Sequence, residues 1–427
     1  MQRLTIVLPA AVAAQAAIRW WLGSRQIRAV RAHRQRIPAA FVGQIDLLDQ
    51  QRAADYTIAR ARIGRSLGIF DAALVLLATQ GGGIAAAAAA FQRLAWPEPW
   101  RGTAVVLTVL LAIRLAALPF ALWRTFGVEA RFGFNRVSPR LFAVDACKQL
   151  ALGLLLGAPL VLATLMLMQK AGEVWWISAW LLWAGATVAL AWAAPRFIAP
   201  LFNRFSPLDD APLERRVAAL VERCGFTARG GVYVMDGSRR SAHGNAYFTG
   251  IGRNKRIVFF DTLIARLEPV EIEGVLAHEL GHFRLHHVRQ GLALSAAASC
   301  GGLALLAWLA RRPEFYAALG VARPSPAAAL LLFVVAAPVF LFFTTPLLSW
   351  WSRRHERAAD EFAARHADAR ALAVALVKLY RDNASTLTPD RLHSAFYDSH
   401  PPAVERIRRL QALAAAGRTP AAQARAT

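Results

Sequence analysis

The stretch Val275-Leu276-Ala277-His278-Glu279-Leu280-Gly281-His282-Phe283 predicts a helix that carries a metal site on one face. Residues four apart lie on the same face of a helix, so His278 and His282 can direct their imidazoles at one point. A zinc ion bound by two imidazoles needs a third protein ligand and an open position for water. Glu279 stands beside the first histidine, where its carboxylate can accept a proton from that water. The alternative, a helix with two solvent-facing histidines, is disfavoured by the hydrophobic residues on both sides.

The third ligand must come from another element, and the best candidate is Glu356 in the segment 352–361. Glu356 and Asp360 are four residues apart, so both can face the same site from one helix. We expect Glu356 to bind the ion and Asp360 to accept a hydrogen bond from a ligand imidazole, which would fix the tautomer of that imidazole. The alternative is an ordinary charged helix whose Arg, Glu and Asp side chains form solvated pairs.

Two further histidines, His286 and His287, follow His282 at distances of four and five residues. His286 could share the helical face of the two expected ligands. We expect both residues to be surface histidines or partners of a ligand side chain, and not ligands themselves. A common longer zinc motif has its third histidine six residues after the second, and it is absent because Val288 occupies that position.

The composition indicates a membrane protein. Of the 427 residues, 56% are hydrophobic and 13 are Trp, and several apolar runs are long enough to span a bilayer. The net charge of +23 arises from arginines that are spread between these runs, so we predict no nucleic-acid partner. Cys147, Cys224 and Cys300 show no paired or metal-type spacing, which argues against a disulfide framework and against a cysteine zinc site.

Seven apolar runs predict a mainly α-helical, polytopic membrane fold with seven transmembrane helices. The start of the first run could also belong to a signal peptide, but we favour a retained span because apolar residues continue to Leu22. Residues 195–288 are more polar, and the zinc-motif helix is expected to begin in them near Pro269. The predicted spans are residues 4–22, 67–90, 104–123, 149–168, 174–194, 291–310 and 327–350, and the predicted strands are residues 231–235, 245–248 and 256–260.

The distribution of arginines predicts the orientation in the membrane. The Arg-rich segments 23–65 and 124–148 are expected in the cytoplasm, which leaves the N-terminus outside and the zinc motif and the C-terminus in the cytoplasm. After His282 the chain crosses twice and returns to the same side before Glu356. The expected regions are an N-terminal transmembrane region with about five spans (1–194), a cytoplasmic catalytic segment (195–288), two further spans (289–350), a helical catalytic segment (351–410) and a disordered tail (411–427).

Several segments between residues 120 and 407 match the pattern of a known family. They are Phe132-Gly133-Phe134-Asn135-Arg136 with Asp145 and Lys148, Ile198-Ala199-Pro200-Leu201-Phe202-Asn203, Ser241-Ala242-His243-Gly244-Asn245-Ala246-Tyr247-Phe248, Asn254-Lys255-Arg256-Ile257-Val258, the zinc motif, Glu356 to Asp360, and Ser399-His400-Pro401-Pro402. The chain thereby resembles the Ste24-type integral-membrane zinc metallopeptidases, also called CAAX prenyl protease 1. The resemblance implies seven spanning helices around a large water-filled chamber, with a zincin-like α+β catalytic region that bears a short β-sheet.

Matched position by position, the resemblance implies roles for individual residues. His278, His282 and Glu356 would bind one Zn²⁺ ion. Glu279 would be the general base, and Asp360 the partner of a ligand.

The resemblance also implies residues that contact the substrate. Asn245, Ala246, Tyr247 and Phe248 match a strand edge that pairs with an extended peptide through main-chain hydrogen bonds. His400 and Arg406 match a late histidine and arginine near the site, where a cation or imidazole would stabilise the oxyanion. The alternative for His400 is a histidine at a helix start before Pro401 and Pro402.

The expected function is hydrolysis of peptide bonds by an integral-membrane zinc metalloendopeptidase. Family members in eukaryotes trim a prenylated CAAX peptide, in the endoplasmic reticulum or nuclear membrane. The Ala- and Arg-rich composition suggests a bacterial inner membrane, where processing or quality control of membrane proteins is the expected task and prenylated substrates are not. The expected partners are therefore a peptide or protein substrate, which could be prenylated or membrane-bound, and the lipid bilayer.

Three other functions are disfavoured. A membrane zinc transporter predicts the histidine pair inside a span, whereas here it lies outside one. A catalytically silent membrane scaffold predicts a broken motif, and this motif is intact. A four-span stress protease would lack the long apolar N-terminal half.

Overall fold

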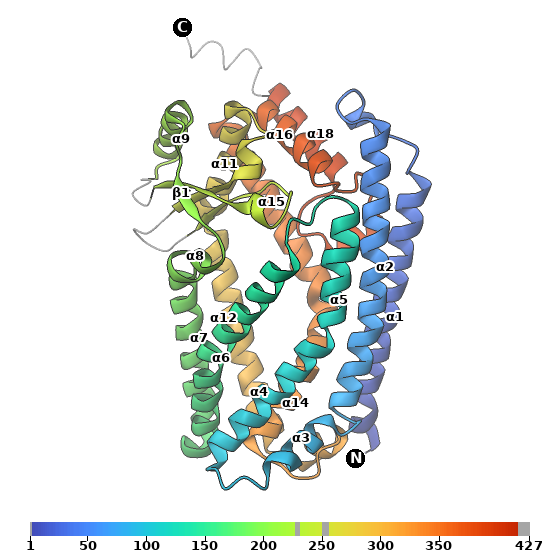
Figure 1. The fold of residues 1–427 in the computed structure, drawn as a ribbon, viewed down its shortest axis with the longest axis vertical. Coiled ribbons are helices and arrows are strands. Elements are labelled where there is room, and N and C mark those ends of the chain that lie inside the picture. Colours follow the sequence, from blue (N-terminus) through green and yellow to red (C-terminus); the bar gives the residue numbers. More distant parts are fainter. Residues whose placement is uncertain (1, 227–230, 250–255, 417–427) are drawn as a thin grey trace.

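Long helices make up most of the molecule, and the small sheet with several shorter helices lies at one end of them (Figure 1). The computed structural model describes residues 2–226, 231–249 and 256–416. In this part of the chain six helices are long and apolar enough to cross a membrane, and a bent pair brings the total to seven. The helices of these spans are α1 (Gln2–Ala32), α2 (Leu47–Ala78) with α3 (Gly83–Phe91), α4 (Glu98–Ala116), α6 (Pro139–Lys170), α7 (Trp175–Ala193), α12 (His287–Ala310) and α14 (Pro326–Leu341), which continues into α15 (Thr345–His366).

Each predicted span lies on one or more of the helices, which confirms the polytopic helical fold, although residues 104–123 run past the end of α4 and residues 327–350 run past the end of α14. The helices are longer than the apolar runs, because polar residues extend them beyond the membrane: α2 begins at Leu47, within a segment expected to be polar. The second predicted span is interrupted. Gly82 has a φ of 79°, in the left-handed region that glycine tolerates, and α2 and α3 meet there at 48°.

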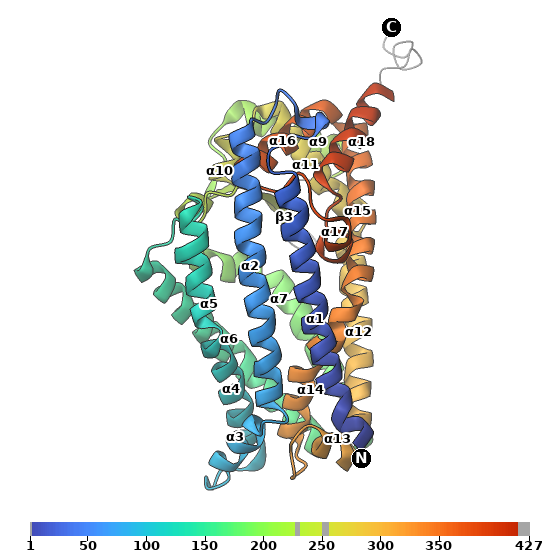
Figure 2. The same ribbon diagram turned by 90° about the vertical axis from the view of Figure 1, so that its right-hand side faces the viewer.

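The two ends of the helical array differ in character. The N-terminus, α3 and α13 (Pro313–Ala318) lie at one end, and the polar elements around the sheet lie at the other (Figure 2). Helices α1 and α2 run side by side between the two ends (Figures 1 and 2). The remaining helices are α5 (Leu118–Leu122), which continues into a π-helical turn at Trp123–Glu129, α8 (Ala199–Phe202), α9 (Ala211–Arg223), α10 (Asp261–Ile264), α11 (Pro269–Arg284), α15 (Thr345–His366), α16 (Ala369–Asp382), α17 (Arg391–Tyr397) and α18 (Ala403–Ala416).

A small mixed sheet lies beside α11 at the polar end. Its four strands within the described residues are β1 (Phe205–Pro207), β2 (Val232–Met235), β3 (Ala246–Thr249) and β4 (Arg256–Phe260), in the order β1-β2-β4-β3. The strands β2 and β4 are parallel, and the other two pairs are antiparallel. The three predicted strands agree with β2, β3 and β4. The short strand β1 gave no strand pattern, because it has only three residues and ends in proline. Strand β3 forms one edge of the sheet, and its outer side has no partner strand among the described residues.

Helix α11 begins where the sequence predicted. Pro269 takes the first helical position, and Glu268 and Glu271 form a reciprocal capping box there. Two glycines then allow close packing. A Cβ atom on Gly281 would meet the Cα of Ala359 on α15 at 3.1 Å, and a Cβ on Gly274 would meet the backbone of Leu372 on α16 at 3.0 Å. Glycine at these positions therefore lets α11 approach both neighbouring helices.

The predicted disordered tail is partly wrong. Residues 411–416 continue helix α18, which ends at Ala416. Leu410 is fully buried, and Leu413 packs against the same hydrophobic core, so burial of apolar side chains holds this last turn in the helix. The rest of that segment, residues 417–427, lies outside the described residues, as do Asn254 and Lys255 of the family pattern.

Candidate metal centre

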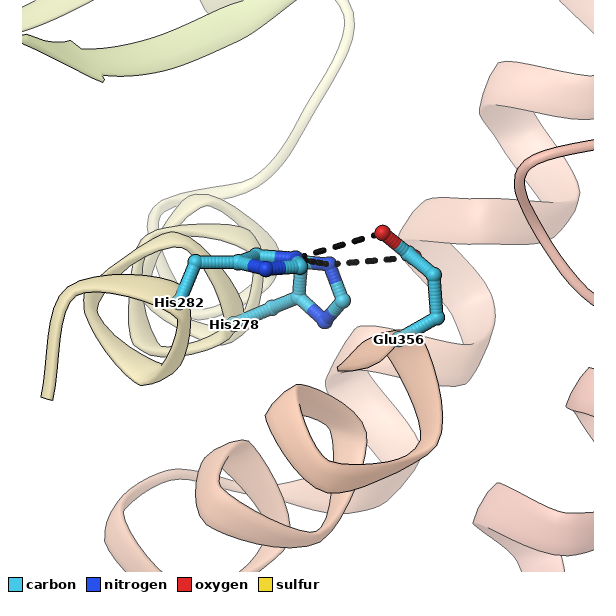
Figure 3. A group of neighbouring side chains, drawn as sticks. All are labelled: His278, His282 and Glu356. Atoms are coloured by element: carbon cyan, nitrogen blue, oxygen red, sulfur yellow. Dashed lines mark hydrogen bonds and ion pairs between the residues drawn. The ribbon is translucent and has the colours of Figure 1, made fainter. Parts of the chain in front are cut away.

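Three side chains converge between α11 and α15 (Figure 3). His278 and His282 project from one face of α11, and their Nε2 atoms are 3.2 Å apart. Glu356 projects from α15 toward them, with Oε1 3.2 Å from Nε2 of His282 and Oε2 3.4 Å from Nε2 of His278. One ligand atom from each of the three residues lies within 4.8 Å of the other two. Because His278 and Glu356 are buried and His282 is half-buried, solvent reaches the group from one side.

The other ring nitrogen of His278 faces Asp360. Its Nδ1 lies 2.8 Å from Oδ1 of Asp360, and Asp360 is only 1% exposed. The guanidinium of Arg406 donates to both carboxylate oxygens of Asp360, from Nε at 2.9 Å and from Nη2 at 2.8 Å. Asp360 thus lies between a histidine and a buried arginine, which hold its carboxylate in place.

The other ring nitrogen of His282 faces a further histidine. Its Nδ1 lies 3.0 Å from Nδ1 of His287, the first residue of α12. The Nδ1 atoms of His278 and His282 both have partners, so both Nε2 lone pairs can point into the space between α11 and α15.

The residues fit a divalent metal ion. Two convergent imidazoles and one carboxylate form a donor set that zinc uses in catalytic sites, and two Nε2 atoms 3.2 Å apart repel each other unless a proton or a cation lies between them. Burial and the charge of Arg406 lower the pKa of His278, but hydrogen bonds to Asp360 and Glu356 outweigh them and raise that pKa to about 9. In the absence of a metal ion, a proton therefore takes the place of the cation.

Glu279 lies next to a small cavity that opens on the metal centre. Burial is the main cause that raises the pKa of its carboxyl group above the ordinary value. The cavity has a volume of about 140 Å³. Its polar lining residues are Asn245, His278, Glu279, His400 and Arg406, and its apolar lining residues are Ala246, Leu263, Val275, Leu372, Leu376 and Leu379.

His400 and Arg406 occupy different positions around the centre. His400 is exposed, and its Nδ1 lies 2.6 Å from Oε2 of Glu356. Arg406 is 5% exposed and directs its guanidinium at Asp360 behind His278, although it also lines the cavity. The exposed imidazole is therefore better placed to meet a substrate, and the buried guanidinium is better placed to hold Asp360.

The edge strand β3 brings its first residues to the cavity. Asn245 and Ala246 line the cavity, and the carbonyl oxygen of Asn245 accepts a hydrogen bond from the backbone of Phe260. Bonding alternates along an antiparallel pair, so the backbone N–H of Ala246 points to the free side of the edge. The side-chain oxygen of Asn245 accepts a hydrogen bond from that N–H at 2.9 Å. Tyr247 and Phe248 follow in the strand, and Phe248 pairs with Ile257 of β4.

The sequence did not reveal which of the two histidines that follow His282 contacts its imidazole. His286, which seemed able to share the ligand face, instead is exposed in the turn between α11 and α12 with a φ of 60°. His287, by contrast, is buried against His282. The sequence shows the spacing of the two histidines. It does not show the break between α11 and α12, which exposes His286 and buries His287.

Known proteins match the chain over nearly its whole length. The family model "CAAX prenyl protease N-terminal, five membrane helices" matches residues 26–204, and the model "Peptidase family M48" matches residues 207–414. The CAAX prenyl protease 1 homolog of Arabidopsis thaliana is 35% identical over 299 residues, which cover 69% of this chain and 70% of the relative. The homolog of Homo sapiens is 32% identical over 352 residues, which cover 72% and 73%.

A solved structure matches as well. The crystal structure of S. mikatae Ste24p covers 95% of this chain and 98% of that protein, with a TM-score of 0.86 and 26% sequence identity. The fold and these similarities define an integral-membrane metalloprotease with several membrane-spanning helices. The chain belongs to the CAAX prenyl protease 1 family, or Ste24 family, of M48 peptidases.

Proposed function

We propose that the chain is a zinc metalloendopeptidase in which His278, His282 and Glu356 hold the ion and Glu279 is the general base. The observation that carries the proposal is the convergence of both Nε2 atoms and one carboxylate between α11 and α15. The family of M48 metallopeptidases supports zinc as the metal. A transporter is disfavoured because α11, which carries both histidines, is not among the candidate spans.

Each residue around the site has a different role in hydrolysis. A bound zinc ion supplies Lewis acidity, which lowers the pKa of a water molecule and polarises the scissile carbonyl. Glu279 takes the proton from the water and delivers it to the leaving amine. His400, exposed beside Glu356, donates to the oxygen that becomes negatively charged. Asp360 holds His278, and Arg406 holds Asp360.

The substrate enters as an extended peptide along β3. The outward N–H of Ala246 exchanges its contact with the Asn245 side chain for a carbonyl of the substrate. One substrate side chain then points into the cavity beside Glu279, whose leucines and valine suit an aliphatic group. Main-chain pairing recognises an extended backbone, and the cavity adds a preference for one side chain.

The substrate class follows from the relatives. Proteins named CAAX prenyl protease 1 suggest a peptide or protein substrate that is prenylated or embedded in the membrane. We place the metal centre and the C-terminus in the cytoplasm and the N-terminus outside, because the Arg-rich segments 23–65 and 124–148 flank the spans on that side. In a bacterial inner membrane, processing or removal of damaged membrane proteins is the corresponding task.

The test uses the purified protein in detergent and compares bound zinc with cleavage of farnesylated and plain peptides. Glu279→Gln should keep one zinc ion and lose cleavage by about 10²- to 10⁴-fold, because only the base is removed. His278→Ala should lose both zinc and cleavage. Glu273→Gln, on the same helix but outside the site, is the matched control and should cleave like the unaltered protein. Full turnover by Glu279→Gln would refute the role given to that residue.

A further inference from the structure

The Nδ1 atoms of the two expected histidine ligands have different hydrogen-bond partners. His278 faces the carboxylate of Asp360, whereas His282 faces the imidazole of His287, with 3.0 Å between their Nδ1 atoms. The two rings meet nearly edge to face, at an angle of 71° and with 5.1 Å between their centroids. This contact supplies the second ligand with a neutral partner in place of a charged one.

The direction of this hydrogen bond follows from the chemistry of a metal ligand. His282 can bind an ion through Nε2 only if that atom keeps its lone pair, so its proton must be on Nδ1. Nδ1 of His282 then donates, and Nδ1 of His287 must accept. Consequently His287 has to carry its own proton on Nε2.

The backbone brings His287 to this position. Helix α11 ends at Arg284, α12 begins at His287, and His286 between them has a φ of 60°. A left-handed conformation at a residue other than glycine is unfavourable and persists only where the surrounding structure enforces it. The tight turn lets the first side chain of α12 fold back onto the last turn of α11.

Helix α15 holds the far face of His287. The ring of His355 stacks on His287 with centroids 3.9 Å apart and planes 2° apart, and Trp351 packs against His355 at 4.4 Å. His355 directly precedes Glu356, so α15 provides one expected ligand and also the stack behind another. His287 is 9% exposed, which leaves its ring little freedom to turn away.

We propose that His287 is a positioning residue that fixes His282 in the tautomer with its proton on Nδ1, and that His355 holds His287 in the required orientation. The proposal rests on the zinc site proposed above. It adds a residue outside the ligand set that sets how tightly the site holds a metal ion. Loss of such a partner typically weakens metal affinity by about 10- to 100-fold.

The experiment replaces the acceptor and keeps the shape. His287→Phe retains a flat ring against His355 but cannot accept a hydrogen bond, whereas His287→Asn retains an acceptor near the position of Nδ1. The dissociation constant for Zn²⁺ is measured by competition with a chelator in the full-length protein, together with the absorption spectrum of the Co²⁺ form. We expect His287→Phe to bind Zn²⁺ about 10- to 100-fold more weakly with an altered Co²⁺ spectrum, and His287→Asn to recover most of the affinity.

The matched control is His355→Phe, which makes the same substitution in the same stack without removing the acceptor. It should bind Zn²⁺ within a few-fold of the unaltered protein. Equal weakening by both phenylalanine variants would assign the effect to packing and overturn the proposal, as would unchanged affinity in His287→Phe. If the unaltered protein binds no Zn²⁺, the proposed function itself fails, which is a separate outcome.

Discussion

At the scale of the single residue, a proton and a metal ion compete for the imidazole of His278. The hydrogen bonds to Asp360 and Glu356 raise the pKa of this imidazole to about 9, although burial and Arg406 oppose the shift. The same carboxylates that attract the proton would attract a divalent cation. The site is therefore built for positive charge, whichever cation supplies it.

The first prediction concerns the proton that the metal displaces. At pH 7.5, below a pKa of about 9, His278 is protonated in the metal-free protein, and a ligand imidazole must be neutral. We expect binding of one Zn²⁺ ion to release about one proton from His278, and the affinity to rise with pH and level off above about pH 9. Calorimetry in buffers of different ionisation enthalpy measures the proton count. Binding without proton release at pH 7.5 would contradict the protonated state that we give to His278 in the metal-free protein.

Arg406 lines the cavity and also lies behind His278. Its expected action on the oxyanion stays a prediction. Its guanidinium makes two hydrogen bonds to Asp360 and lies 3.4 Å from Oε2 of Glu356, so we predict that it also helps to orient His278 through Asp360. A buried carboxylate of this kind needs a cationic partner, because an unpaired charge inside the protein is costly.

At the scale of the element, the contact between α11 and α15 decides whether the ligands meet. The two helices come from segments separated by two spans, and Gly281 lets their backbones touch. This glycine lies one residue before His282, so any change in the helix spacing acts directly on the distance to Glu356.

The second prediction tests that contact. Gly281→Ala places a Cβ 3.1 Å from the Cα and 3.2 Å from the carbonyl oxygen of Ala359, atoms that cannot move aside as a flexible side chain would. We expect a loss of about 1–3 kcal/mol in unfolding free energy and weaker Zn²⁺ binding, measured by thermal unfolding with and without a chelator.

Its matched control is Gly291→Ala on α12, where a Cβ would meet nothing within 4 Å. That variant should be as stable as the unaltered protein or slightly more so, since alanine is the better helix former. A Gly281→Ala protein with unchanged stability and unchanged Zn²⁺ affinity would show that the helices can separate at no cost.

At the scale of the whole molecule, α1 extends to the end that carries the candidate metal centre. Arg25 of α1 makes a two-point ion pair with Asp390, at 3.1 and 2.9 Å, and the side chain of Gln26 accepts a hydrogen bond from the backbone of the same aspartate. Asp390 caps α17, which immediately precedes the loop that carries His400. The membrane helices therefore help to position one wall of the site.

The third prediction concerns the orientation of the whole chain. If the bent pair α2 and α3 is one span, the described residues cross the membrane seven times, and the Arg-rich segments 23–65 and 124–148 then predict the N-terminus outside and the C-terminus in the cytoplasm. Alkaline phosphatase fused after the C-terminus should be inactive in a bacterial host, and a green fluorescent protein there should fluoresce. The same phosphatase inserted after Gly172, between α6 and α7, should be active. The reverse pattern would invert the proposed orientation.

The sequence by itself determined the spans, the small sheet and the residues of the candidate metal group. Apolar runs of spanning length can satisfy their backbone inside a bilayer only as helices, and spacings of four residues define one face of a helix. These rules act locally, so they could be applied to His278, His282, Glu356 and Asp360 without coordinates. They also located the start of α11, because Pro269 suits a first helical turn.

Only the tertiary structure decided which groups lie behind His282 and behind Asp360. His287 reaches His282 because one left-handed residue redirects the chain. His355 stacks on His287 from the distant helix α15, and Trp351 of that helix packs against His355. The bond between Arg406 and Asp360 likewise joins two helices that sequence spacing cannot relate. Contacts of this kind depend on how closely whole elements pack, and packing is a property of the assembled fold.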